Sequence, residues 1–279
     1  MIPAPFDYEV AESVEHAVEL LGTREEVKLL AGGHSLIPLL RLRFARPSLL
    51  VDIGRVSDLA YVRDAGDKLA IGAMSRHHDV QHDPLIQEHC PIVSHTAGLI
   101  GDPQVRHRGT IGGSLAHGDP ASDLPAVMLA LDAELVVRGD DGERVVPAAE
   151  FFRGVFETAV GPHDVLTEIR IPKLGPAGWS YLKFNRRAQD WATVGVAAVV
   201  LRSNGTIDHA AVALTNMGAT PIRAAATEQV LGSADDVDVA AEAVVEGTDP
   251  PSDTNGSAEY RRHLARVLTR RALGEAIAR

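Results

Sequence analysis

The first part of the chain shows one helical spacing of apolar residues and two short apolar runs. Apolar residues recur every three or four positions over 14–21, and a glycine directly after them is a stop signal. The runs 27–30 and 49–53 are typical of strands, and the leucine-rich stretch 36–42 predicts a helix with Ser35 as its N-cap. A strand, a helix and a strand in this order predict a compact βαβ unit.

The middle of the chain mixes further strands with helices. Apolar spacing predicts strands over 69–73 and 165–171 and helices over 84–100 and 123–131. Two short runs within 134–146 flank an Asp-Asp-Gly turn, which is typical of a hairpin. Mixed secondary structure of this kind predicts an α+β fold.

The segment 172–178 is the densest in proline and glycine, and we place a boundary there. After it, strands are expected over 179–184, 193–201 and 206–215, with an Asn-Gly turn before the last of them. These runs predict an antiparallel meander. Three helical stretches follow, and the loop 250–256 precedes the last one.

Composition narrows the classes of function. The formal net charge of -11 argues against a nucleic-acid partner, and no apolar run reaches the roughly 20 residues of a membrane span. The single cysteine, Cys90, excludes an internal disulfide and cannot ligate an iron–sulfur cluster unaided. Redox chemistry would therefore need an organic cofactor or another chain. The N-terminal segment lacks the features of a secretory signal, so a cytoplasmic location is expected.

Two glycine-rich segments carry candidate chemistry. The first glycine motif, Ala31–Ser35 (AGGHS), lies where a predicted strand turns into a helix, and the second, Gly109–Ser114 (GTIGGS), repeats its Gly-Gly theme. Glycine lets backbone N–H groups approach a ligand, and a helix N-terminus favours phosphate. Each motif alone is equally well a structural turn, whereas two together could hold both sides of a diphosphate. Neither matches a Rossmann fingerprint or a Walker loop.

At these segments the sequence resembles the FAD-binding medium subunits of molybdenum hydroxylases, and among them the aerobic carbon monoxide dehydrogenase type. The resemblance covers nearly the whole chain. It is carried in order by MIPAPFDY, LLAGGHSLIPLLRLR, GTIGGSLAHGDPASDLPA, YLKFNRRAQDWATVGVAAVV, ALTNMGATPIRA and YRRHLARVLTRRAL.

The resemblance implies a two-subdomain FAD-binding fold of the vanillyl-alcohol-oxidase (PCMH) type, followed by a C-terminal domain of antiparallel strands and a helical bundle. Residues 1–55 would form the first FAD subdomain around the βαβ unit. Residues 56–175 would form the second FAD subdomain, and residues 176–279 the C-terminal domain.

The resemblance also implies the residues that hold FAD without a covalent bond. Asp123 would lie near the adenosine side, Lys183 near the isoalloxazine, and Trp191 where the carbon monoxide enzymes carry a tyrosine against the flavin; His117 replaces an asparagine of those enzymes. The two glycine motifs would wrap the pyrophosphate through Ala31, Gly32, Gly33, His34, Ser35 and Leu36 on one side and Thr110, Ile111, Gly112, Gly113 and Ser114 on the other.

The implied function is electron transfer within a larger oxidoreductase. A large partner subunit with a molybdenum cofactor would oxidise the substrate, and a small subunit with [2Fe–2S] clusters would relay electrons to FAD, which passes them to an acceptor. We expect a dimer of heterotrimers, a heterohexamer, either free in the cytoplasm or at the inner face of the membrane. No catalytic residue is assigned within this chain. Carbon monoxide dehydrogenase is the best single choice of complex.

Two other functions stay open from the sequence. One is a self-contained FAD oxidase or reductase with the same two-motif cradle. About one hundred residues after 178 leave little room for a substrate domain, which disfavours the oxidases. The other is an assembly subunit without flavin, which the two intact glycine motifs disfavour.

Each candidate residue also has a structural interpretation. His34 could be a turn residue only, Asp119 and Asp123 could cap a helix, Lys183 could line a solvated face, and Trp191 could be a core or subunit contact.

A group of histidines and a group of arginines are given a structural interpretation only. The histidines lack the spacing of a metal site, so none is expected at His77, His78, His82, His89 and His95. A solvated helix face with acidic neighbours is expected for Arg261, Arg262, Arg266, Arg270 and Arg271.

Overall fold

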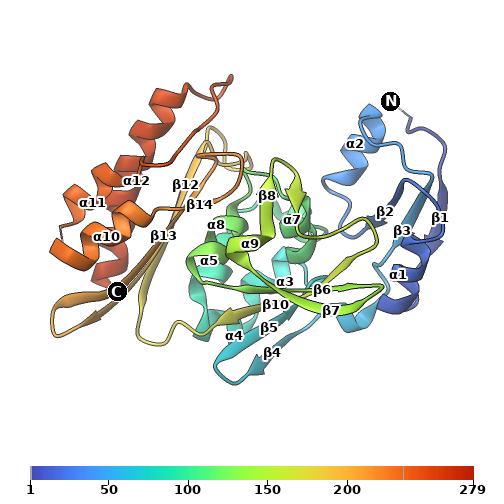
Figure 1. Cartoon of the computed structure of the whole chain (residues 1–279), viewed down its shortest axis with the longest axis horizontal. Helices are drawn as coiled ribbons and strands as arrows, with labels where there is room; N and C mark the ends of the chain where they lie inside the picture. The colour runs from blue at the N-terminus through green and yellow to red at the C-terminus, as the bar shows by residue number, and fades with distance from the viewer. Residues whose placement is uncertain (1, 235) are drawn as a thin grey trace.

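The computed structural model describes residues 2–234 and 236–279. The N-terminal part contains a three-stranded parallel sheet in the order β1–β3–β2, with β2 and β3 joined through α2 (Figure 1). This arrangement confirms the predicted βαβ unit. The element bounds are β1 (Asp7–Val10), α1 (Val14–Leu21), β2 (Val27–Leu30), α2 (Leu36–Leu42) and β3 (Leu49–Asp52).

Strand β1 was not predicted from the sequence. Its residues Asp7, Tyr8 and Glu9 are exposed, so the strand shows no apolar face. It forms because its backbone pairs with β3 in register, which adds hydrogen bonds without burying side chains.

A five-stranded antiparallel sheet occupies the middle of the chain, in the order β4–β5–β10–β6–β7. The bounds of its strands are β4 (Val62–Ala65), β5 (Lys68–Gly72), β6 (Glu134–Gly139), β7 (Gly142–Pro147) and β10 (Val165–Pro172). The strands and the hairpin predicted in this region are thereby confirmed. A short 3-10 helix (Ser57–Leu59) precedes the sheet, and β8 (Phe152–Gly154) pairs with β9 (Glu157–Thr158).

Helices pack on the apolar face of this sheet, and they correct the sequence interpretation in two places. The expected helix over 84–100 is interrupted at Cys90, because Pro91 starts a new helix and cannot continue the previous hydrogen-bond ladder. The second glycine motif was expected to be a turn, but residues from Ile111 onward are helical. The helices are α3 (His77–His82), α4 (Pro84–His89), α5 (Pro91–Gly98), α6 (Pro103–Arg106), α7 (Ile111–His117), α8 (Asp123–Ala130) and α9 (Ala148–Phe151).

The C-terminal part is an antiparallel sheet in the order β11–β12–β13–β14, with helices on one face (Figure 1). The predicted meander is confirmed, and β14 adds a short fourth strand. The bounds are β11 (Gly178–Phe184), β12 (Val194–Ser203), β13 (Thr206–Thr215), β14 (Ile222–Arg223), α10 (Ala225–Ala234), α11 (Val237–Ala243) and α12 (Ala258–Ala278).

Strand β12 is buried on both faces. Ala197 and Val199 belong to the core shared with α5 and α8, whereas Val196 and Ala198 pack in the core beneath α12. A strand covered on both sides is apolar at almost every position, which explains the continuous run in the sequence. The C-terminal sheet is thus packed directly against the middle of the chain, and the predicted α+β class is confirmed.

Candidate functional site

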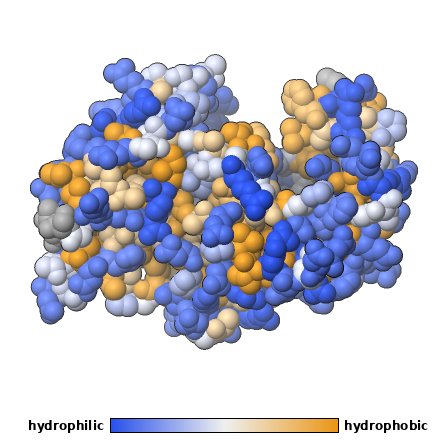
Figure 2. All heavy atoms as spheres, viewed as in Figure 1, coloured by the Kyte–Doolittle hydropathy of each residue, from blue (hydrophilic) through white to orange (hydrophobic). Residues whose placement is uncertain are grey.

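A cavity of about 770 Å³ lies where the three parts of the chain meet. Its walls come from the loop between β2 and α2, from α7, and from β11 with the loop that follows it. Figure 2 shows a hollow in the surface between the N-terminal lobe and the centre of the molecule. All the predicted cofactor residues line this cavity except Ile111. The side chain of Ile111 is fully buried in the core instead.

The first glycine motif presents unused hydrogen-bond donors. Among the described residues, the backbone N–H groups of 32–36 donate to no protein acceptor, and the first bond of the following helix is that of Ile37 to the Gly33 carbonyl. Gly33 has φ +81°, a left-handed conformation that favours glycine. A Cβ at Gly32 would lie 2.3 Å from the Arg108 carbonyl oxygen, so this turn packs directly on the segment before α7.

Ser35 differs from the prediction. It precedes α2, but its backbone is helical at φ -92° and ψ -47°, and its hydroxyl accepts no capping hydrogen bond. A side-chain cap requires extended backbone at the cap position, and Ser35 does not have it. The N–H groups that a cap would satisfy stay available for a bound anion.

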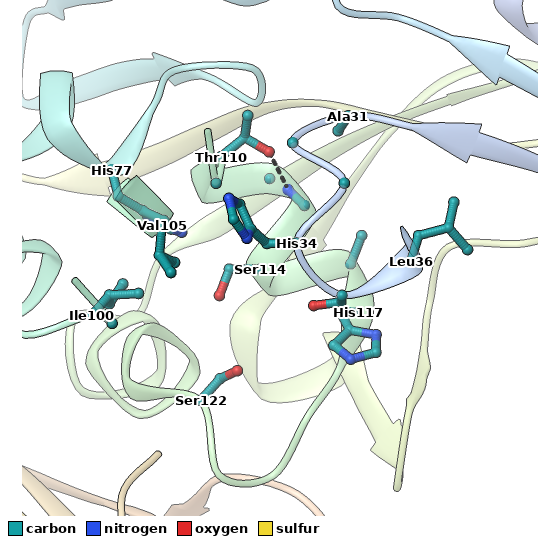
Figure 3. Close-up of a pocket in the computed structure, with 18 of the residues that line it drawn as sticks. Ala31, His34, Leu36, His77, Ile100, Val105, Thr110, Ser114, His117 and Ser122 are labelled. Atoms are coloured by element: carbon teal, nitrogen blue, oxygen red, sulfur yellow. Dashed lines mark hydrogen bonds between the residues drawn. The ribbon is translucent and has the colours of Figure 1, made fainter. Parts of the chain in front are cut away.

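Most N–H groups of the second glycine motif donate within the protein. Ile111 donates to the Ser75 carbonyl, Gly112 to the Ala73 carbonyl at 2.8 Å, and Gly113 to the Thr110 hydroxyl at 3.1 Å (Figure 3). These three N–H groups are therefore not free for a ligand, whereas among the described residues the Thr110 N–H has no protein acceptor.

The glycine at 112 serves close packing, because a Cβ there would lie 2.4 Å from the Cβ of Ala73. Polar side chains remain on the cavity wall: Ser114 lines the cavity, and Figure 3 shows it on α7 close to His34.

Asp123 and Lys183 form a buried ion pair at the cavity wall. The Lys183 ammonium donates to Asp123 Oδ2 at 2.9 Å and to the Leu99 carbonyl at 3.3 Å, and both ionic side chains are about 5% exposed. The Tyr181 hydroxyl donates to Asp123 Oδ1 at 2.7 Å. The pKa of Asp123 is raised above its usual value, because the effect of burial exceeds the opposite effect of the adjacent Lys183 ammonium.

This contact corrects two expectations. Lys183 is buried, so the interpretation as a solvated face is wrong. Asp123 and Lys183 touch each other, so they cannot serve opposite ends of an extended dinucleotide as the resemblance implied. Asp123 does not act as a cap either, because Ser122 is the N-cap residue of α8.

Trp191 lies on the loop between β11 and β12 and is 64% exposed at the cavity. The exposure excludes a core role for this side chain. The end of its loop is held at two carbonyls: Asn216 donates to Ala192 at 2.7 Å, and Arg261 donates to Thr193.

The expected solvated arginine face on α12 is wrong for Arg261. Its side chain is completely buried, with a second hydrogen bond to Asp253 at 2.7 Å. Arg270, on the same helix, pairs with Asp238 at the surface as expected. The difference follows from helical spacing. Arg261 and Arg270 are nine positions apart, which is about two and a half helical turns, so they lie on opposite faces of α12.

Several cavity residues were not predicted. Figure 3 places Ile100 and Val105 on the wall opposite the first glycine motif, and His77 and His117 also contribute. Burial lowers the pKa of His77 to about 4 and lowers that of His117. Both rings are therefore neutral near neutral pH. Only the proline after Asp102, a helix-start signal, could have drawn attention to this wall.

The described residues hold no group of three or more His, Cys, Asp or Glu side chains placed to bind a metal ion. Within residues 2–234 and 236–279, no helix is long and apolar enough to cross a membrane. Cys90 is buried, its thiol donates to the Pro172 carbonyl, and burial raises its pKa to about 12. A thiol of this kind is not available as a metal ligand.

Comparison with protein families matches almost the whole chain. The family described as "FAD binding domain in molybdopterin dehydrogenase" matches residues 4–174, and "CO dehydrogenase flavoprotein C-terminal domain" matches residues 179–276. These matches confirm the predicted PCMH-type FAD-binding fold followed by a C-terminal domain of strands and helices.

Individual relatives are similar to this chain over nearly their full length. The chain is 42% identical to the carbon monoxide dehydrogenase medium chain of Hydrogenophaga pseudoflava, with 100% of this chain and 99% of that relative covered. It is also 42% identical to the 6-hydroxypseudooxynicotine dehydrogenase complex subunit alpha of Paenarthrobacter nicotinovorans, with 100% and 97% covered.

A solved structure gives the same result. The carbon monoxide dehydrogenase from Hydrogenophaga pseudoflava that lacks the Mo-pyranopterin moiety of its cofactor matches with a TM-score of 0.97 and 43% identity, over 100% of this chain and 99% of that one. Sequence and structure thus agree on one family. The chain belongs to the FAD-binding medium subunits of the molybdenum hydroxylases, and it is the flavoprotein subunit of an oxidoreductase complex.

Proposed function

We propose that the cavity binds FAD without a covalent bond and that the chain transfers electrons through it between partner subunits and an acceptor. The observation that carries this proposal is the row of unused N–H groups at 32–36, which opens onto a cavity of about 770 Å³. Cavities of several hundred cubic ångströms are the usual size for cofactors, and convergent N–H groups bind phosphate oxygens.

The residues present fit such a cofactor. Gly33 has the left-handed backbone that turns successive N–H groups toward one point, and Gly32 lets the loop lie against the opposite wall. The N–H groups of the first glycine motif would hold the pyrophosphate. On the other wall, the Thr110 side chain is already a helix cap, so Ser114 is the residue there that would reach the same phosphates.

The second polar anchor is the Asp123–Lys183 pair. Of the three N–H bonds of the Lys183 ammonium, two have acceptors among the described residues and one is free at the cavity. This N–H would donate to an acceptor atom of the isoalloxazine. Trp191 would lie against the ring system, because an exposed indole at a cavity mouth offers a flat apolar surface.

The chemistry that FAD supplies when bound is the exchange of one electron at a time with storage of two. The chain itself orients the cofactor, keeps water from part of it and leaves one edge accessible. Its buried Cys90 cannot ligate a cluster, so electrons that come from an iron–sulfur cluster would have to arrive from another polypeptide.

We infer that the partners are a small subunit with [2Fe–2S] clusters and a large subunit with a molybdenum cofactor, arranged as a dimer of heterotrimers. Carbon monoxide dehydrogenase is the best single assignment for the complex, supported by the full-length similarity to two solved enzymes of that name. A relative named for a nicotine-derived substrate is equally similar at 42% identity, so similarity alone does not select the substrate.

The test combines cofactor analysis with single-chain reduction. The full chain purified alone should be yellow, contain FAD, bleach with dithionite and stay oxidised with carbon monoxide, purines, nicotinate or aldehydes. The complex from the native host should contain iron and molybdenum, and its substrate should bleach the same flavin.

Three results would contradict the proposal. A colourless chain that cannot bind added FAD would indicate an assembly subunit. Direct reduction of the isolated chain by a substrate would indicate a self-contained oxidase or reductase. Bleaching of the complex by another substrate but not by carbon monoxide would reject only the carbon monoxide assignment.

A further inference from the structure

The buried ion pair of the cavity is supported from the C-terminal sheet. Tyr181 and Lys183 lie two positions apart on β11, so their side chains point to the same face. Both contact Asp123 at the start of α8, one at each carboxylate oxygen, at 2.7 and 2.9 Å. The position of the Lys183 ammonium therefore depends on a carboxylate whose other oxygen is fixed by a tyrosine outside the cavity lining.

The tyrosine hydroxyl occupies space that a glycine leaves open. A Cβ at Gly195 on the neighbouring strand β12 would lie only 2.5 Å from the Tyr181 hydroxyl oxygen and 3.0 Å from the Cβ of Thr215. Gly195 pairs with Lys183 on one side and with Thr215 on the other. Its φ is not in the left-handed region, so the backbone conformation does not explain the glycine. The space taken by the Tyr181 hydroxyl, and to a lesser degree by Thr215, explains it.

We propose that Gly195 and Tyr181 are positioning residues for Lys183, although neither lines the cavity. Gly195 leaves room for the Tyr181 hydroxyl, the hydroxyl fixes the Asp123 carboxylate, and the carboxylate holds the ammonium with its free N–H toward the cofactor. This inference rests on the proposed binding of FAD. It gives the C-terminal sheet a direct role in cofactor binding.

Tyr181→Phe tests the hydroxyl, with Tyr61→Phe as the matched control. Tyr61 also donates to a carboxylate, that of Glu168, but it does not line the cavity. FAD titration of the flavin-free full chain should give a dissociation constant raised about tenfold in Tyr181→Phe, because a hydrogen bond to a charged group is lost. The constant for Tyr61→Phe should stay within about twofold of the wild type.

The spectrum of bound FAD gives a second measurement that loss of stability alone would not change. In Tyr181→Phe the visible absorption should shift in the same direction as in Lys183→Met, because both variants alter the ammonium at the ring. Tyr61→Phe should leave the spectrum unchanged.

A double variant separates positioning from packing. Gly195→Ala alone should lower the melting temperature of the flavin-free chain and weaken FAD binding. In Gly195→Ala/Tyr181→Phe the added methyl group meets no tyrosine hydroxyl but still lies 3.0 Å from the Cβ of Thr215, so the melting temperature should recover in part toward that of Tyr181→Phe, while FAD binding stays weak. If Gly195→Ala does not fold, the Tyr181→Phe comparison decides alone.

The outcomes distinguish this inference from the proposed function. Wild-type affinity and spectrum in Tyr181→Phe, or recovery of FAD binding in the double variant, would overturn the inference. Failure of the wild-type chain to bind FAD would overturn the proposed function instead.

Discussion

The left-handed turn at Gly33 allows a quantitative test of the FAD cradle. Gly33→Ala places a Cβ on a backbone with φ +81°, which costs about 1–2 kcal/mol for an L-residue. The same Cβ would lie 2.7 Å from Ile37 Cδ1, but this atom ends a flexible side chain and can move. The expected loss of folding stability is therefore about 1–2 kcal/mol from the backbone alone.

Gly66 supplies a matched control. It has nearly the same conformation, at φ +85°, and an added Cβ there would meet no atom within 4 Å. It lies in the turn between β4 and β5 and does not line the cavity. Gly66→Ala should therefore lose a similar amount of stability with no effect on the cofactor site.

The two variants should differ in FAD binding. We expect the Gly33→Ala chain to relieve its backbone strain by a change of φ at this position. This change would turn the N–H groups of 33–36 away from the pyrophosphate. Losing two hydrogen bonds to a charged pyrophosphate, each worth about 1.5–3 kcal/mol, weakens binding at least 100-fold.

Thermal unfolding of the flavin-free chains and FAD titration by fluorescence measure the two quantities separately. A Gly33→Ala chain that binds FAD within a few-fold of Gly66→Ala would refute the argument, because the turn would then have only a structural role.

Three other predictions concern the cavity and its support. Acid precipitation should leave the yellow colour in the supernatant, because FAD is not covalently bound; colour in a pellet that yields a flavin peptide containing His34 would contradict this. Trp191→Ala should change flavin retention or re-oxidation in the assembled complex more than substrate oxidation, whereas Phe44→Ala, at an exposed aromatic outside the cavity, should change neither. Arg261→Met should lower the free energy of unfolding by about 2–4 kcal/mol, because the Thr193 carbonyl loses its buried donor. The surface variant Arg270→Met should cost less than about 1 kcal/mol, and equal losses in chemical denaturation would show that burial is not the reason.

Much of the fold follows from local sequence. Apolar residues at helical spacing predicted α1, and alternating or continuous apolar runs predicted β2, β3, β10 and the C-terminal meander. These elements were predictable because each buries the side chains that form its pattern. Strand β1 was not, because its pairing uses the backbone while its side chains stay exposed.

The family and the location of the cavity were also accessible from the sequence. The motifs that carry the resemblance include both glycine segments and the residues around Asp123, Lys183 and Trp191. All three of these side chains line the cavity. Motifs of this kind indicated which residues share a cavity, although the contacts among them are not visible in the sequence.

Tertiary structure alone decided how these residues interact. The two glycine motifs look alike in sequence, yet the N–H groups of 32–36 are unused while those of 111–113 are bonded, because the carbonyls of Ala73 and Ser75 lie beside α7. No local pattern predicts a carbonyl that arrives from a distant segment.

The same limit applies to charged side chains. A run of arginines on a helix does not reveal that Arg261 is buried, and sequence distance hides the contact between Asp123 and Lys183. Burial and pairing of polar groups depend on which surfaces the packed elements bring together. The sequence determined the elements and the family, whereas packing determined which donors and charges remain free to meet a cofactor.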